Sequence, residues 1–240
     1  MRKRKLRAIS LLLAGIMSVG LFAGCSSDSG DNSSDNTDSG GTKDSIVIAT
    51  SGETPSLSPT EHNAVAGSYM NLLTYNTLFR SGMDLEPEPD LVDTYENIDE
   101  STWQFKIKEG VKFHNGETMT ADDVVASIQW AQGFAEVNLY NSDIVSITKV
   151  DDLTVEIKTD GPDAMLLSNL CHHGNAIVPK SLIDSGHDFN TDPVGTGPYK
   201  LVEWKRGDSL TFEAFEDYFK GPAKIKNMTW KIIPEGSSRT

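Results

Sequence analysis

The chain is 240 residues long and acidic, with 35 Asp and Glu against 21 Lys and Arg and a formal net charge of −14. Proteins that bind nucleic acids rely on basic patches that neutralise phosphates, so this composition argues against a nucleic-acid partner. An acidic surface of this kind favours solubility outside the cell.

The N-terminus has the pattern of a secretory signal. Basic residues precede an apolar stretch from Ala8 to Ala23, and no acidic residue lies before Asp28. The apolar stretch is shorter than the ~20 residues that a membrane-spanning helix needs. We therefore predict that residues 1–24 are a signal peptide. The basic residues are Arg2, Lys3, Arg4, Lys5 and Arg7.

The segment after the apolar stretch is predicted to be a lipid anchor and a tether. Residues 21–25, Leu-Phe-Ala-Gly-Cys, resemble a bacterial lipobox, so we expect cleavage before Cys25 and lipid attachment to it; the alternative is an ordinary secreted cysteine. Residues 26–45 contain no hydrophobic side chain and cannot offset their ordering entropy, so 25–45 are predicted to be a lipidated Cys and a disordered tether. Cys171 then has no partner within the chain, and a buried, inert thiol is expected.

Two elements are predicted at the start of the folded part. Residues 46–50 have the composition of a short apolar strand. Apolar residues from Val65 onward recur at helical spacing, which predicts a helix over 64–79. A loop rich in Ser, Thr and Pro connects the two elements.

Residues 85–131 hold the most informative pattern. Trp103, Phe105 and Ile107 alternate with polar residues, which predicts a half-buried strand. Residues 111–113 resume that pattern. The Asn-Gly pair at 115–116 is typical of a tight turn, because both residue types tolerate positive φ.

A helix is predicted directly after this turn. Thr120 stands three residues before Asp123, which is the spacing of a capping box. Val124, Ile128 and Ala131 follow at i, i+4 and i+7, so one face of the helix is predicted to pack inward.

The remaining elements mix helices and strands without strict alternation. This order indicates an α/β fold with a mixed sheet rather than a doubly wound parallel one. Strands are predicted over 144–150, 153–158, 201–204, 210–214 and 228–232, with turns at 151–152 and 206–208 and a short helix over 163–170.

Two blocks of motifs resemble a known family. Residues 89–91 (Pro-Asp-Leu), 105–116 and 120–127 match the patterns P-D-L-A-x-S-W, F-x-L-R-x-G-V-K-F-H-D-G and T-A-x-D-V-x-x-S, although Tyr95 replaces the usual Trp and Asn115 the usual Asp. A second block runs from 194–199 through 218–222 to 232–234. From about Ile46 onward, the chain resembles the family 5 extracellular solute-binding proteins, which include dipeptide- and oligopeptide-binding lipoproteins of ABC transporters.

The resemblance implies a fold and a role. Residues 46–240 are expected to form the N-terminal lobe of a type II periplasmic-binding-protein fold, with the second lobe missing because family members are roughly twice as long. The protein is expected to be a monomer, lipid-anchored at the extracytoplasmic face of the cell membrane (periplasmic or outer surface). Its partners would be a peptide ligand, a permease and the permease's ATPase subunits. Alternatives are the same scaffold binding a nickel complex, haem or oligosaccharide, or an extracytoplasmic peptide sensor.

The resemblance also gives candidate ligand-binding residues. Asn63, Ala64 and Val65 align with the loop that approaches the ligand, although they equally fit a plain helix start. His172 aligns with a position that faces the cleft, and the alternatives are a structural or surface role or a contact with metal or haem. Tyr140 is a candidate for the edge of the cleft, with a core position as its alternative.

Other patterns do not indicate chemistry. Residues 195–198, Gly-Thr-Gly-Pro, lack the Lys-Ser/Thr of a phosphate loop and are predicted to be a tight turn. His114 is predicted to be a turn residue. The adjacent His172 and His173 are expected to point to opposite faces of an extended chain, which makes them a poor chelating pair. The sequence therefore predicts no enzyme, no catalytic residue, no cofactor and no bound metal.

Overall fold

The computed structural model describes residues 44–238, which belong to the unit Thr42–Thr240. The predicted signal peptide 1–24, Cys25 and most of the predicted tether lie outside the described residues. Within 44–238, no helix has both the length and the apolar character needed to cross a membrane.

The described elements alternate irregularly along the chain, as the sequence predicted. The strands are β1 (Ser45–Thr50), β2 (Phe79–Ser81), β3 (Pro87–Pro89), β4 (Val92–Asp99), β5 (Thr102–Ile107), β6 (Ile144–Asp151), β7 (Thr154–Thr159), β8 (Tyr199–Lys205), β9 (Ser209–Ala214) and β10 (Asn227–Ile232). The helices are α1 (Val65–Thr74), α2 (Ala121–Gln132), α3 (Leu166–Asn169) and α4 (Lys180–Ser185), with 3-10 turns η1 (Asn138–Tyr140), η2 (His173–Asn175) and η3 (Gly236–Ser238).

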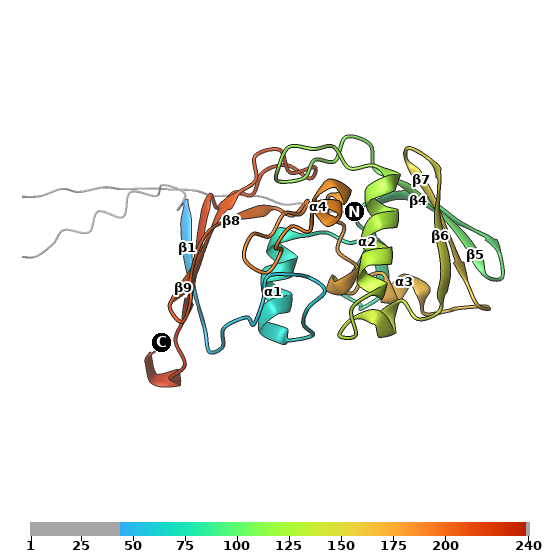
Figure 1. Ribbon diagram of the computed structural model, residues 1–240. Coiled ribbons are helices and arrows are strands. Elements are labelled where there is room, and N and C mark those ends of the chain that lie inside the picture. The colour runs from blue at the N-terminus through green and yellow to red at the C-terminus, as the bar shows by residue number, and fades with distance from the viewer. Residues whose placement is uncertain (1–43, 239–240) are drawn as a thin grey trace, which may run out of the picture. The chain divides into compact units, whose positions relative to one another are not determined.

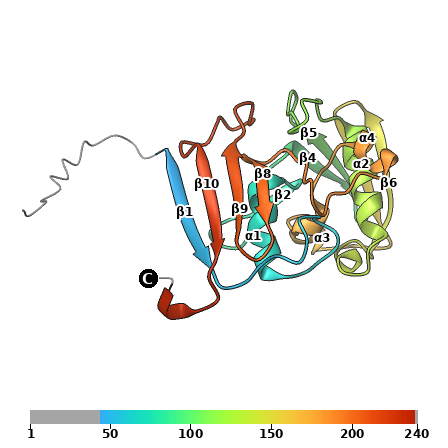
Figure 2. The same cartoon turned by 60° about the vertical axis from the view of Figure 1, so that its left-hand side comes forward.

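One four-stranded sheet joins the two ends of the described chain. Its order is β1-β10-β9-β8, with β1 parallel to β10 and the other neighbours antiparallel, so the prediction of a mixed sheet is confirmed. Helix α1 lies beside this sheet (Figures 1 and 2). The buried residues between them are Leu57, Met70, Tyr199, Leu210, Phe212 and Ala214.

A second four-stranded sheet has the order β4-β5-β7-β6 and is antiparallel throughout. Helix α2 runs along it (Figure 1) and packs against β6 and β7. The predicted inward face of α2 is confirmed, because Val124, Ile128 and Ala131 are fully buried. The capping box is present, and the Thr120 backbone N–H donates to Asp123 Oδ2 at 2.8 Å.

The predicted helix over 64–79 is wrong at its C-terminal end, because α1 stops at Thr74. The backbone turns to an extended conformation at Tyr75, and the Thr74 hydroxyl donates to the Met70 carbonyl inside the last turn. The chain then enters β2, where Phe79 is fully buried in the core beside α2. Packing of this side chain into the core overrides the helical spacing of the sequence.

Two glycines let the segment before β8 approach the C-terminal end of α1 closely. A Cβ at Gly195 would lie 2.3 Å from the Thr74 carbonyl oxygen, and one at Gly197 would lie 2.4 Å from the Thr74 carbonyl carbon. The Gly197 N–H also donates to that oxygen at 2.9 Å. The Gly-Thr-Gly segment is therefore a site of close backbone approach, which only residues without a side chain permit.

Two further local predictions are corrected. Residues 111–113 form no strand, and only an isolated bridge joins Lys112 to Thr118. Positive φ occurs at Gly116, at 90°, whereas Asn115 keeps negative φ. Glycine alone supplies the left-handed conformation that this turn needs.

Candidate functional site

Three of the predicted ligand residues meet in one cluster, which we call the Asn63 cluster (Asn63, Tyr140 and His172). The rings of Tyr140 and His172 stack with centroids 3.6 Å apart. His172 Nε2 lies 3.2 Å from Asn63 Oδ1, and Asn63 Nδ2 lies 3.5 Å from the Tyr140 hydroxyl. Residues separated by up to 109 positions in the sequence thus form a closed set of contacts.

The local fold assigns the protons in this cluster. His172 caps the turn η2, and its Nδ1 accepts from the Gly174 N–H at 3.1 Å. A neutral imidazole has one donor and one acceptor nitrogen, so Nε2 carries the proton and donates to Asn63 Oδ1. The Asn63 amide nitrogen is then a donor to Tyr140, whose hydroxyl keeps its own proton for another acceptor.

Two more histidines extend the cluster inward. The centroid of the His173 ring lies 4.1 Å from that of His172 and 5.3 Å from that of His62. His173 Nε2 donates to the His62 carbonyl at 3.2 Å, while Nδ1 lies 3.3 Å from the Ser68 hydroxyl. His62 is buried and packs on Gly67, where a Cβ would lie 2.0 Å from the ring.

The expectation that His172 and His173 point to opposite faces is wrong. It assumed an extended chain, but the backbone turns into η2 at this point and brings the two rings together. Among residues 44–238, no group of three or more His, Cys, Asp or Glu is arranged to hold a metal ion.

The three histidines are neutral at physiological pH. Burial, together with the neighbouring His173 and His62, lowers the pKa of His172 to about 3. Burial and the adjacent His173 lower the pKa of His62 to about 4, and burial also lowers the pKa of His173. The cluster is therefore an uncharged surface that offers both donors and acceptors.

Ala64 and Val65 lie at the start of α1 but add no side-chain contact to the Asn63 cluster. Ala64 is the N-cap residue, with its backbone N–H bonded to His62 Nδ1 at 3.3 Å. The Val65 side chain is 69% exposed, and Tyr69 and Leu72 farther along α1 are 50% and 68% exposed. Val65 and Leu72 thus expose apolar side chains on α1, while the Tyr69 ring stacks on Trp230.

A hollow of about 300 Å³ adjoins the cluster. This volume lies at the lower end of the ~300–1,000 Å³ range of small-molecule pockets. Its lining residues are Ser68, Leu72, Ser81, Tyr140, Ser168, Cys171, His172 and His173. Cys171 is half-buried rather than fully buried as predicted, and burial raises the pKa of its thiol.

The sequence missed several parts of this site. His62, Ser68 and His173 complete the cluster, yet isolated polar residues beside predicted ones carry no signal of their spatial role. The predicted turn position of His114 is confirmed, but the sequence did not indicate that its half-buried ring also donates from Nε2 to the Gly197 carbonyl at 2.9 Å.

The profile described as "Bacterial extracellular solute-binding proteins, family 5 Middle" matches residues 86–240. The chain belongs to this family. Its described fold is that of a lobe of a type II periplasmic-binding protein, so the predicted family and fold class are confirmed.

Curated relatives are about 30% identical to the chain over the residues that align. A glutathione-binding protein of Pectobacterium atrosepticum is 31% identical over 80% of this chain and 39% of its own length. An oligopeptide-binding protein of Bacillus subtilis is 28% identical over 99% of this chain and 46% of its own. A nickel-binding protein of Staphylococcus aureus is 30% identical over 68% of this chain and 32% of its own length. The chain spans less than half the length of these curated relatives.

Solved family 5 structures superpose on the same part of the chain. The Bacillus subtilis oligopeptide-binding protein in complex with a nonapeptide gives a TM-score of 0.73 at 27% identity, over 81% of this chain and 41% of that protein. A Campylobacter jejuni protein in complex with Ni(L-His) gives a TM-score of 0.71 at 27% identity, over 82% of this chain and 41% of that protein.

Proposed function

We propose that the chain provides the N-terminal lobe of a substrate-binding lipoprotein of an ABC importer. The protein captures peptides outside the membrane and delivers them to a permease driven by ATPase subunits, without being an enzyme itself. Family membership and the oligopeptide-binding relative of similar fold support this role. Residues 46–240 form the lobe, and the protein acts as a monomer.

The Asn63 cluster is the observation that carries the proposal. A peptide backbone is neutral and presents both N–H donors and carbonyl acceptors. The Asn63 amide and the Tyr140 hydroxyl match that chemistry, and the neutral His172 ring positions both without imposing a charge. Exposed apolar side chains on α1 lie nearby for contact with varied ligand side chains. The backbone at Ala64 and Val65 completes the proposed site.

A second candidate ligand is a nickel–histidine complex. The adjacent imidazoles of His172 and His173 favour it, since imidazole is a preferred nickel ligand and relatives of both Staphylococcus aureus and Campylobacter jejuni bind nickel. The neutral state of these rings leaves a nitrogen lone pair on each, although internal hydrogen bonds use them.

Calorimetry on the intact protein separates the two ligands. Titration with di- to pentapeptides should release or absorb heat with a 1:1 stoichiometry, while the nickel–histidine complex should give none. Binding of the nickel complex with no heat from any peptide overturns the proposal and leaves the nickel ligand as the function.

The anchor is proposed at Cys25, on the lipobox pattern of the sequence. Such an anchor places the protein on the extracytoplasmic face of the cell membrane. Metabolic labelling with a radioactive fatty acid should mark the wild-type protein and leave Cys25→Ser unlabelled. Equal labelling of both forms would show that the lipid is attached elsewhere.

A further inference from the structure

A second cavity of about 410 Å³ opens beside the Asn63 cluster. It shares Leu72, Ser81, Cys171 and His173 with the hollow described above, so the two spaces are neighbours. Its far wall is polar and is built from three separate parts of the chain. The residues of that wall are Asn76, Thr77, Arg80, Asp90, Tyr218 and Lys220.

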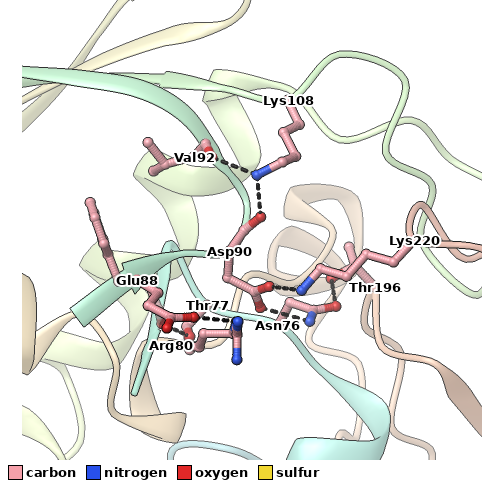
Figure 3. A network of polar contacts seen from close by, with 10 residues as sticks. Asn76, Thr77, Arg80, Glu88, Asp90, Val92, Lys108, Thr196 and Lys220 are labelled. Atoms are coloured by element: carbon pink, nitrogen blue, oxygen red, sulfur yellow. Dashed lines mark hydrogen bonds and ion pairs between the residues drawn. The ribbon is translucent and has the colours of Figure 1, made fainter. Parts of the chain in front are cut away.

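Asp90 is the buried centre of this wall, with 3% of its surface exposed. One carboxylate oxygen pairs with the Lys220 ammonium, and the other accepts from Asn76 Nδ2 at 2.8 Å (Figure 3). Asn76 Oδ1 in turn accepts from the Thr196 hydroxyl at 3.0 Å. Both Asp90 oxygens are therefore occupied, and little of the carboxylate is left for a ligand.

The cations on the wall keep donors available. An ammonium has three donors and a guanidinium five, and Lys220 and Arg80 each use part of theirs on one carboxylate, that of Asp90 and of Glu88. Their side chains are 41% and 53% exposed. Lys108 stands behind Asp90 and is occupied by the backbone carbonyls of Asp90 and Val92, each at 2.6 Å (Figure 3).

Tyr218 lines the same wall as the two cations. Burial raises the pKa of Tyr218, the Asn76 side chain and Lys220 lower it, Asp90 raises it and Arg80 lowers it. The wall and its ionic partners hold three cations (Arg80, Lys108 and Lys220) against two carboxylates (Glu88 and Asp90). This positive wall stands in a chain whose formal charge is −14.

We propose that this cavity binds a carboxylate group of the peptide ligand, held by the free donors of Lys220 and Arg80. The inference rests on the proposed peptide-binding function and adds a preference for acidic ligands to it. An ammonium group is disfavoured, since it would meet two cations while the oxygens of Asp90 are already bonded. A Glu or Asp side chain and a C-terminal carboxylate both supply the required group.

Calorimetry with matched peptides on the intact protein tests the proposal. Tetra-alanine reports peptide binding itself, and peptides with Glu or Gln at each position in turn report the preference for charge. At one position Glu should bind about tenfold more tightly than Gln, the effect expected of one charge-assisted hydrogen bond. If the C-terminus supplies the carboxylate, C-terminal amidation should instead weaken binding about tenfold.

Two variants and a matched control identify the wall. In Lys220→Met the ratio of the affinities for the Glu and Gln peptides should fall to about one. Because this variant leaves Asp90 without its cation, the double variant Asp90→Asn with Lys220→Met should do the same in a well-folded protein. Lys224→Met removes an exposed charge from the same loop and should keep the preference.

The outcomes are distinct. Binding of tetra-alanine with equal affinity for Glu and Gln peptides, and no effect of amidation, overturns the acidic preference and leaves the peptide function standing. An equal loss of preference in Lys224→Met overturns it as well, because the effect is then general electrostatics. No binding by any peptide overturns both proposals.

Discussion

Replacement of His114 by Gln should remove a pH dependence from the stability of this lobe. His114 Nε2 donates to the Gly197 carbonyl at 2.9 Å, and Nδ1 lies 3.4 Å from the Gly195 N–H, which requires a neutral ring. Burial lowers the pKa of His114 from its usual 6.5 to about 4. A second proton would turn Nδ1 from an acceptor into a donor that faces another donor.

The magnitude follows from the two pKa values. Below about pH 6.5 the unfolded chain binds a proton at this residue, whereas the folded protein does so only near pH 4. Stability from His114 is therefore complete above pH 6.5, falls as the pH drops toward 4 and stays low below it. At ~1.36 kcal/mol per pH unit between the two pKa values, the free energy of unfolding falls by about 3 kcal/mol in total.

Urea unfolding, followed by tryptophan fluorescence between pH 7 and pH 4, measures this loss. Gln retains an amide donor and acceptor but does not titrate, and the other histidines and carboxylates are common to both proteins. The wild type should therefore lose about 3 kcal/mol more than His114→Gln over this interval. Parallel curves for the two proteins would refute the assignment of a buried, neutral His114.

Further substitutions test the packing and the polar network. Gly197→Ala should destabilise the protein by about 1–3 kcal/mol because its Cβ meets the backbone at the end of α1, while Gly161→Ala, with open space around it, should change stability little in the same urea titration. Lys220→Met should lower stability by about 1–3 kcal/mol, and adding Asp90→Asn should recover part of that loss; equal stability of the single and double variants would contradict the pairing of the two charges. Asp123→Ala should lower the thermal midpoint by the equivalent of about 0.5–2 kcal/mol, because it removes the capping box of α2, and calorimetric scanning that shows no shift would contradict this role.

Periodicity predicted most of the elements because their buried faces follow regular patterns. Alternation at Trp103, Phe105 and Ile107 predicts β5, and the spacing after Thr120 predicts α2 and its cap. The end of α1 was beyond such reasoning. The backbone of Thr74 contacts glycines more than 100 residues later in the chain, and local patterns hold no information about that contact.

The sequence likewise predicted some features of the candidate site and not others. The resemblance indicated Asn63, Tyr140 and His172, which the structure brings into contact, and their part in ligand binding remains a prediction. Neither the resemblance nor the residue spacing indicated the neutral state of His172 or its contact with His173. Both depend on the turn η2 and on burial, which arise only when distant segments pack together.

The central claim is that peptides are held at the Asn63 cluster, and calorimetry with His172→Ala tests it most directly. His187→Ala is the matched control, because its ring packs on Phe189 in a different part of the lobe. For a peptide that binds the intact wild-type protein, loss of the ring that positions Asn63 and Tyr140 should weaken the affinity about tenfold in His172→Ala. The control should bind as the wild type does. Unchanged affinity in His172→Ala would contradict the account and place the ligand elsewhere.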